Sequence, residues 1–107
     1  HEVTILDKDE RKLNEISSKI NAFTFVGDGA SINDLENAQI QNSDIFVAVT
    51  DKDEVNLISC FIANQYNIPL KISRVQNNEF SNFDIKRLGI DLFINTNYAV
   101  AKEVENL

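Results

Sequence analysis

Histidine and cysteine are scarce in this chain, whose 107 residues contain one of each, His1 and Cys60. A lone cysteine excludes an internal disulfide and a cysteine cluster for zinc. Within these residues no Ser-His or Cys-His pair for nucleophilic catalysis can be assembled, and we assign His1 no role. Cys60 stands in the apolar run Ile58-Ser59-Cys60-Phe61-Ile62, where we expect a small buried core residue.

Basic residues and long apolar runs are also few. Ten Lys and Arg stand against 17 Asp and Glu, a net charge of −7, and no basic stripe suited to nucleic acid phosphates is present. No apolar run approaches the roughly 20 residues of a membrane helix, and no signal-peptide pattern opens the chain. We therefore expect one domain over residues 1–107, cytosolic, that acts on any membrane through a partner.

Short apolar runs alternate with longer stretches of helical periodicity, a pattern typical of a parallel α/β sheet. Strands are predicted at 3–6, 22–26, 45–49, 70–75 and 92–94. Helices are predicted at 7–20, from Ser31 onward, and at 51–66, 80–87 and 97–107. The run at 45–49 has no polar alternation, as expected of a central strand covered on both faces. The predicted fold class is a Rossmann-like, doubly wound α/β sheet.

The tetrapeptide Asp-Lys-Asp-Glu occurs at 7–10 and again at 51–54, each time directly after an apolar strand. In both places the first aspartate can be the helix N-cap, with the glutamate three residues later closing a capping box. A calcium loop is disfavoured because neither stretch has the glycine and distal glutamate of an EF-hand. We expect no metal site.

Parallel sheets bind ligands beyond the carboxyl ends of their strands, so the residues there are the candidates for a site. Asp7 ends the first strand, where an acidic residue can accept hydrogen bonds from ribose hydroxyls or merely cap its helix. Gly27-Asp28-Gly29 ends the second strand. Asp28 can accept from the exocyclic amine of an adenine, and the alternative is a plain glycine-rich turn.

Three further polar residues follow the next two strands. Thr50 and Asp51 open a helix, and their hydroxyl, carboxylate and amides can line a crevice while they also cap that helix. Arg74, near the end of the fourth strand, can hold a phosphate in a bidentate contact or be an ordinary rim arginine. No acid and base are placed to serve one substrate, so catalysis is poorly supported.

Six stretches together resemble the N-terminal nucleotide-binding domain of TrkA-like potassium-uptake regulators, also called the RCK or KTN domain. The resemblance covers essentially the whole chain in family order. The stretches are Val3-Thr4-Ile5-Leu6-Asp7-Lys8-Asp9, Val26-Gly27-Asp28-Gly29, Ile45-Phe46-Val47-Ala48-Val49-Thr50, Asp53-Glu54-Val55-Asn56-Leu57, Ile72-Ser73-Arg74-Val75 and Leu88-Gly89-Ile90-Asp91.

The resemblance implies a cytosolic protein, held at the inner face of the membrane by its partner, that binds NAD(H) or ATP/ADP. It implies control of a potassium channel or transporter subunit. It also implies a homo-oligomer that pairs through its last strand and helix, with Phe93 at the dimer surface. The implied binding residues are Asp7 at the ribose, Asp28 at the adenine, Thr50 with Asp51 in mid-crevice and Arg74 at the phosphates, with Lys8 and Gly27 beside them.

The sequence departs from that family at its start, where a strand and a Gly-x-Gly-x-x-Gly turn normally precede the segment matching Val3. None of the three glycines, Gly27, Gly29 and Gly89, lies in such a turn. Nucleotide affinity is therefore expected to be weak or absent in this chain. In the order 3-2-1-4-5-6 the missing strand would lie between 3–6 and 45–49.

Three outcomes would satisfy the unpaired backbone at that slot. The two strands can pair directly, a second copy can insert a strand, or another segment of a longer protein can fill it. We expect a rearranged or non-monomeric sheet over a monomer with a gap.

Two rival functions stay open beside a regulatory, non-enzymatic module. One is a fragment of an NAD-dependent oxidoreductase, which would need a catalytic residue on a second domain. The other is a structural module for ring assembly without a ligand. Sequence does not rank NAD(H) against ATP/ADP, but a carboxylate at Asp7 repels a 2′-phosphate and makes NADP the least favoured ligand.

Overall fold

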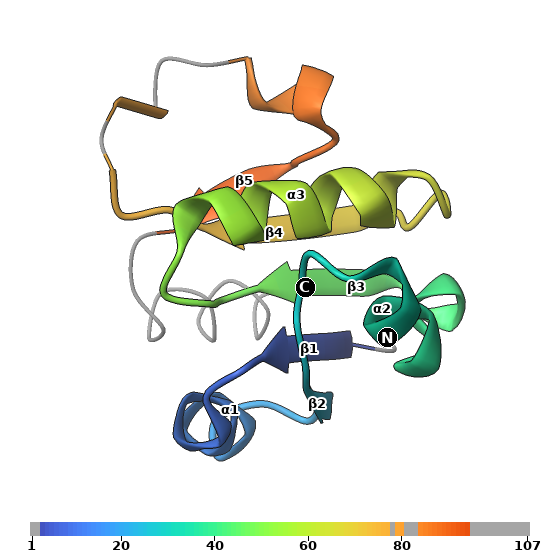
Figure 1. Ribbon diagram of the computed structural model, residues 1–107, viewed down its shortest axis with the longest axis vertical. Helices are drawn as coiled ribbons and strands as arrows, with labels where there is room; N and C mark the ends of the chain where they lie inside the picture. The colour runs from blue at the N-terminus through green and yellow to red at the C-terminus, as the bar shows by residue number, and fades with distance from the viewer. Residues whose placement is uncertain (1–2, 78, 81–83, 95–107) are drawn as a thin grey trace.

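Five parallel strands form one sheet in the computed structural model, which describes residues 3–77, 79–80 and 84–94 (Figure 1). The strands are β1 (Val3–Asp7), β2 (Phe23–Val26), β3 (Ile45–Ala48), β4 (Leu70–Arg74) and β5 (Leu92–Ile94). The helices are α1 (Glu10–Ser17), α2 (Ile32–Asn37) and α3 (Asp53–Asn64), with 3₁₀ turns η1 (Ile40–Asn42) and η3 (Ile85–Leu88). The predicted Rossmann-like α/β class is confirmed.

The strand order is β2-β1-β3-β4-β5, and β1 pairs directly with β3. Their register runs from Val3 opposite Ile45 to Leu6 opposite Ala48. Of the three ways to satisfy the slot expected between these strands, the structure has direct pairing. The resulting order is that of flavodoxin-like sheets, whose chain direction reverses between the first and third strands.

Helices cover both faces because the connections leave β1 in one direction and β3 in the other. Leu13 and Ile16 of α1 pack on one face against residues of β1, β3 and β4, among them Ile5 and Val47. On the other face Leu35 of α2 and Cys60 of α3 belong to a second cluster. That cluster also contains Leu6, Phe46, Ala48, Ile62, Ala63 and Ile90. As predicted, β3 is buried along its whole length.

Two of the predicted helix starts are wrong. Asp9, not Asp7, is the N-cap of α1, and its side chain accepts a hydrogen bond from the Arg11 amide at 2.9 Å. The N-cap position of α3 is occupied by Lys52, not Asp51, without a side-chain cap. Helix 51–66 is accordingly shorter than predicted. Ser31 caps α2 as predicted, accepting from the Asp34 amide at 3.2 Å.

The last third of the chain departs from the predicted helices. Where a helix was predicted at 80–87, the described residues form the 3₁₀ turn η3 at 85–88. Gly89, at φ +78°, ends this turn in the left-handed conformation that glycine adopts readily. The predicted helix at 97–107 and His1 lie outside the described residues. Within the described residues, no helix is long and apolar enough to cross a membrane.

Candidate functional site

A crevice of about 200 Å³ opens where β1 and β3 end side by side. Its lining comes from the segments that follow these two strands: Asp7, Lys8, Asp9, Thr50, Asp51, Lys52 and Val55. This is the point at which the strand order reverses, and loops that diverge from there leave room for a ligand at the carboxyl edge of the sheet. Direct pairing of β1 with β3 brings the two lining segments together.

A larger hollow, about 600 Å³, lies at the opposite end of the strands. Phe23, Phe25, Gln39 and Asp44 are among its lining residues. We place the candidate site in the smaller crevice, because the charged side chains and loop amides gather at the carboxyl ends of the strands. Ligands of open parallel sheets bind at that edge.

Asp7 is a buried carboxylate at the base of the crevice, with 2% of its surface exposed. Its Oδ1 accepts a hydrogen bond from the Asp9 amide at 3.0 Å, whereas Oδ2 is buried and has no hydrogen-bond partner within residues 3–77, 79–80 and 84–94. Burial raises the pKa of the Asp7 carboxyl, a shift that the Asp9 amide and the charge of Lys12 oppose. A buried acceptor costs free energy unless a donor satisfies it, so Asp7 is suited to a ligand hydroxyl.

Asn56 ties the ends of β3 and β4 together from α3. It is fully buried, and its Oδ1 accepts from the Thr50 amide at 2.8 Å and from the Thr50 hydroxyl at 2.6 Å. Its Nδ2 donates to the Thr50 carbonyl at 3.0 Å and to the Arg74 carbonyl at 2.7 Å. One side chain therefore fixes the backbone of two residues at the rim of the sheet.

Asp53 fixes the loop after β4 in a similar way. Its two carboxylate oxygens accept from the amides of Gln76 at 2.9 Å and Asn77 at 2.8 Å. Hydrogen bonds to an ionised acceptor are stronger than neutral ones, and Asp53 is 8% exposed. Asp53 and Asn56, one helical turn apart on α3, hold both loops that flank Arg74 and Thr50.

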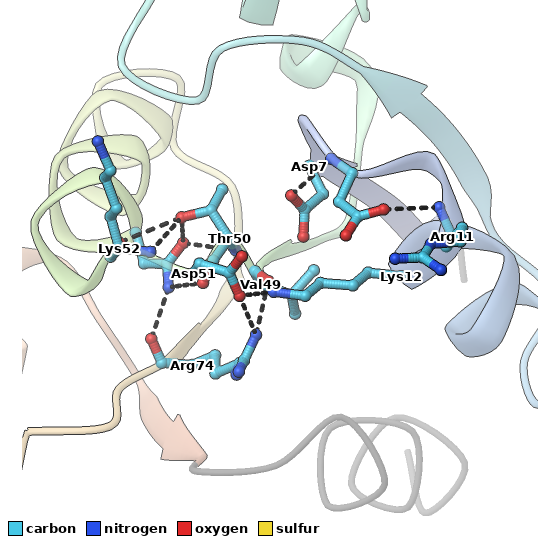
Figure 2. Close-up of polar contacts among 10 residues, drawn as sticks. Asp7, Arg11, Lys12, Val49, Thr50, Asp51, Lys52 and Arg74 are labelled. Carbon is cyan, nitrogen blue, oxygen red and sulfur yellow. Dashed lines mark hydrogen bonds and ion pairs between the residues drawn. The ribbon is translucent and has the colours of Figure 1, made fainter.

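Arg74 reaches back from β4 toward the crevice. Its Nη1 donates to the Val49 carbonyl at 3.2 Å and lies 3.7 Å from Oδ1 of Asp51, while Nε is buried with no hydrogen-bond partner in the described part of the chain. Lys12 of α1 forms an ion pair with the same oxygen of Asp51 from the other side (Figure 2). Two cations from different elements thus converge on one carboxylate.

The Gly27-Asp28-Gly29 loop lies beside the crevice but outside its lining. The Gly27 amide donates to the Asp7 carbonyl at 3.1 Å, and Asp28 accepts from the Ala30 amide at 2.9 Å. The close approach is made by Gly29, because an added Cβ would lie 2.3 Å from Oγ of Ser59. Ser59 donates to the Gly29 carbonyl at 2.6 Å, so this loop is seated on α3.

The structure brings together most of the residues predicted from sequence. Asp7, Lys8, Thr50 and Asp51 line one crevice, and Arg74 joins them through its ion pair. Gly27 and Asp28 adjoin this group without lining the crevice.

Sequence reasoning missed three side chains of the site, Lys12, Asp53 and Asn56. For Asp53 a signal existed, since it is the third residue of the repeated tetrapeptide. Asn56 stands in one of the six stretches of the family resemblance, although no role was expected for it, whereas nothing in the spacing of Lys12 distinguishes it from an ordinary helix residue.

Known proteins are similar to this chain over its whole length. Residues 1–96 match the TrkA-N domain family. The chain is 36% identical over 107 residues to a Trk system potassium uptake protein TrkA homolog of Methanothermobacter thermautotrophicus, covering all of this chain and 49% of that protein. It is 32% identical over 110 residues to a TrkA homolog of Archaeoglobus fulgidus, and 29% identical over 112 residues to TrkA of Halomonas elongata.

Each of these matches covers the whole chain, but only part of the relative. The chain spans about half the length of the Methanothermobacter protein and about a quarter of the other two, 25% and 24%. The family match extends over the strands, the crevice and Arg74. The chain belongs to the TrkA-N domain family.

Proposed function

We propose that this chain is a nucleotide-binding regulatory domain of a potassium uptake system and that it is not an enzyme. Its relatives are described as potassium uptake proteins of Trk systems. The ligand is NAD(H) or ATP/ADP, bound in the crevice between the ends of β1 and β3. In the protein that contains it, the domain works at the cytoplasmic side of a membrane transporter subunit.

One observation carries the proposal, the buried Oδ2 of Asp7, which has no hydrogen-bond partner among the residues that the structure describes. Vicinal ribose hydroxyls are donors of the right kind for an ionised carboxylate. The charge of Asp7 also disfavours a ligand with a 2′-phosphate, so we expect NADPH to bind more weakly than NADH. Arg74 supplies a guanidinium for the phosphates, and the backbone of Thr50, fixed by Asn56, lies between the two.

Regulation follows if the nucleotide favours one of two arrangements of an oligomer that the transporter subunit senses. β5 forms one edge of the sheet, and Phe93 on this strand is half-buried. We propose β5 and the chain beyond it as the surface through which copies pair.

Because the affinity of this chain is expected to be weak without the glycine turn, the test is a titration of the ¹⁵N-labelled chain with NADH, ATP and adenosine followed by amide chemical shifts, which detect weak binding. We expect shifts at Asp7, Lys8 and Thr50, and a loss of affinity of about 1–3 kcal/mol for Asp7→Asn, the range for removing a charged hydrogen-bond acceptor. Because the ionised form binds, wild-type affinity falls as the pH drops through the raised pKa of Asp7, whereas the Asp7→Asn variant shows no such fall.

Two comparisons make this test specific. Glu10→Gln removes an exposed charge near the same helix start and is expected to leave affinity unchanged. Arg74→Ala is expected to weaken ATP and NADH far more than adenosine, because only the former carry phosphates. Unchanged affinities for Asp7→Asn, or equal losses for adenosine and ATP with Arg74→Ala, would contradict the assigned roles.

A further inference from the structure

Lys12 of α1 lies beside the crevice without being among its lining residues, and it reaches the crevice through its ion pair with Asp51. Its side chain is 18% exposed and extends beneath Asp7 to Asp51, as Figure 2 shows. Arg74, whose side chain is 11% exposed, approaches from β4. Both cations meet the same Oδ1 of Asp51, a residue whose own side chain is 69% exposed.

The ion pairs at this point leave donor capacity unused. Two largely buried cations form ion pairs with one exposed carboxylate, that of Asp51, and the other carboxylate near Lys12 is the buried one of Asp7. Among the described residues, Nε of Arg74 is an additional buried donor without a hydrogen-bond partner. Removing a cation from water is costly unless anions or acceptors surround it. A phosphate offers up to two negative charges and three acceptor oxygens, and it matches two converging cations better than one carboxylate does.

The side chain of Asp51 can also move away from the two cations. Asp51 lies in the loop between β3 and α3, it does not cap α3, and its side-chain contacts with the described part of the chain are the two ion pairs. Asp51 is the exposed partner in both ion pairs, and water competes for its carboxylate, which weakens them. An entering phosphate therefore displaces the carboxylate of Asp51 at little cost.

Resting on the proposed function, we propose that Lys12 and Arg74 together bind a phosphate of the nucleotide and that Asp51 competes with it. Lys12 is then a phosphate-binding residue, and Asp51 sets how strongly the crevice discriminates between ligands of different phosphate charge. The carboxylate of Asp51 repels each phosphate charge that comes near it and leaves an uncharged nucleoside unaffected.

The experiment compares adenosine, AMP, ADP and inorganic pyrophosphate on four forms of the chain by amide chemical shifts: wild type, Asp51→Asn, Lys12→Gln and Glu54→Gln. Asp51→Asn is expected to tighten AMP, ADP and pyrophosphate by about tenfold, and Lys12→Gln to weaken them by about tenfold, as expected for one charge at close range in a partly solvated site. Adenosine affinity changes in neither variant.

Glu54→Gln is the matched control, since it removes one exposed carboxylate from the first turn of α3 outside the crevice lining. It is expected to bind all four compounds as wild type does, which separates a local effect from one of net charge.

Weaker or unchanged binding of ADP and pyrophosphate by Asp51→Asn would overturn the competition, and unchanged binding by Lys12→Gln would overturn the role of Lys12. Absence of adenosine binding would instead contradict the proposed function. In that case the pyrophosphate titrations of Asp51→Asn and Lys12→Gln would still test whether Lys12 binds phosphate and Asp51 competes with it.

Discussion

Asn56→Asp is the substitution that tests most directly how the crevice is built. It keeps the size of the side chain and the Oδ1 acceptor, but it replaces an N–H₂ donor by an oxygen. The carbonyls of Thr50 and Arg74, now 3.0 and 2.7 Å from Nδ2, would face a carboxylate oxygen instead. The carboxyl end of β4 and Thr50, just beyond the carboxyl end of β3, would lose the hydrogen bonds that fix their positions.

The expected loss of stability follows from these contacts. Each carbonyl left without its donor costs about 1–3 kcal/mol, and a carboxylate at a fully buried position adds a desolvation cost. The effects share one side chain and do not simply add. We expect the free energy of unfolding to fall by about 3–5 kcal/mol at pH 8, a large part of the stability of a small domain.

The loss should depend on pH in a defined direction. We expect the introduced carboxyl to have a raised pKa in the folded chain, because full burial and two facing carbonyls disfavour its charge more than the Thr50 amide and hydroxyl, which donate to Oδ1, favour it. Its penalty is therefore full above that folded-state pKa and shrinks as the pH falls, when the protonated acid can donate to one carbonyl. Urea unfolding followed by circular dichroism at pH 8 and at pH 5.5, each against wild type at the same pH, measures this.

Asn14→Asp, an exposed position in α1, is the control for the added charge. We expect it to change the free energy of unfolding by less than about 0.5 kcal/mol, as for most surface substitutions. Destabilisation by Asn56→Asp that is no greater than that by Asn14→Asp, or that is equal at both pH values, would refute this reasoning. The hydrogen bonds of Asn56 to Thr50 and Arg74 would then not hold the carboxyl ends of β3 and β4 in place.

Two further predictions concern the packing of α3. Gly29→Ala should lower the free energy of unfolding by about 1–3 kcal/mol, the usual cost of overpacking. The reason is that the added Cβ would lie 2.3 Å from Oγ of Ser59, so Ser59→Ala in the same chain should relieve part of the loss. Gly27→Ala, whose Cβ would meet only ordinary contacts at 3.4 Å, is the control, and equal losses at both glycines would contradict the argument. The Cys60 thiol, fully buried and with a pKa raised to about 12, should react with Ellman's reagent at pH 8 only when urea unfolds the chain; prompt reaction of the folded chain would show that it is accessible.

The strands could be predicted from the sequence because their signal is local. All five apolar runs became strands, and the observed bounds differ from the predicted ones by at most one residue at either end. The pairing of β1 with β3 could not be predicted as firmly, since it depends on which strands meet in space. Direct pairing was one of three outcomes that satisfied the same backbone groups.

The repeated tetrapeptide shows why the site was harder to predict. The first residues of the two copies differ in burial. Asp7 has 2% of its surface exposed, whereas the side chain of Asp51 is 69% exposed. The third residues also differ, since Asp9 caps its own helix whereas Asp53 binds amides in a distant loop. Identical local sequence gave different contacts because the neighbouring elements differ.

Edge strand β2 has a consequence for how this chain behaves in concentrated solution. Phe23 is 60% exposed and Val26 61% exposed, and the four residues Phe23-Thr24-Phe25-Val26 carry no charge, proline or lysine that would protect an open edge. At neutral pH the net charge of −7 keeps copies apart. Near the isoelectric point, about 4.5, this repulsion vanishes and the β2 edges can pair, so aggregation should set in on acidification while the fold is still intact.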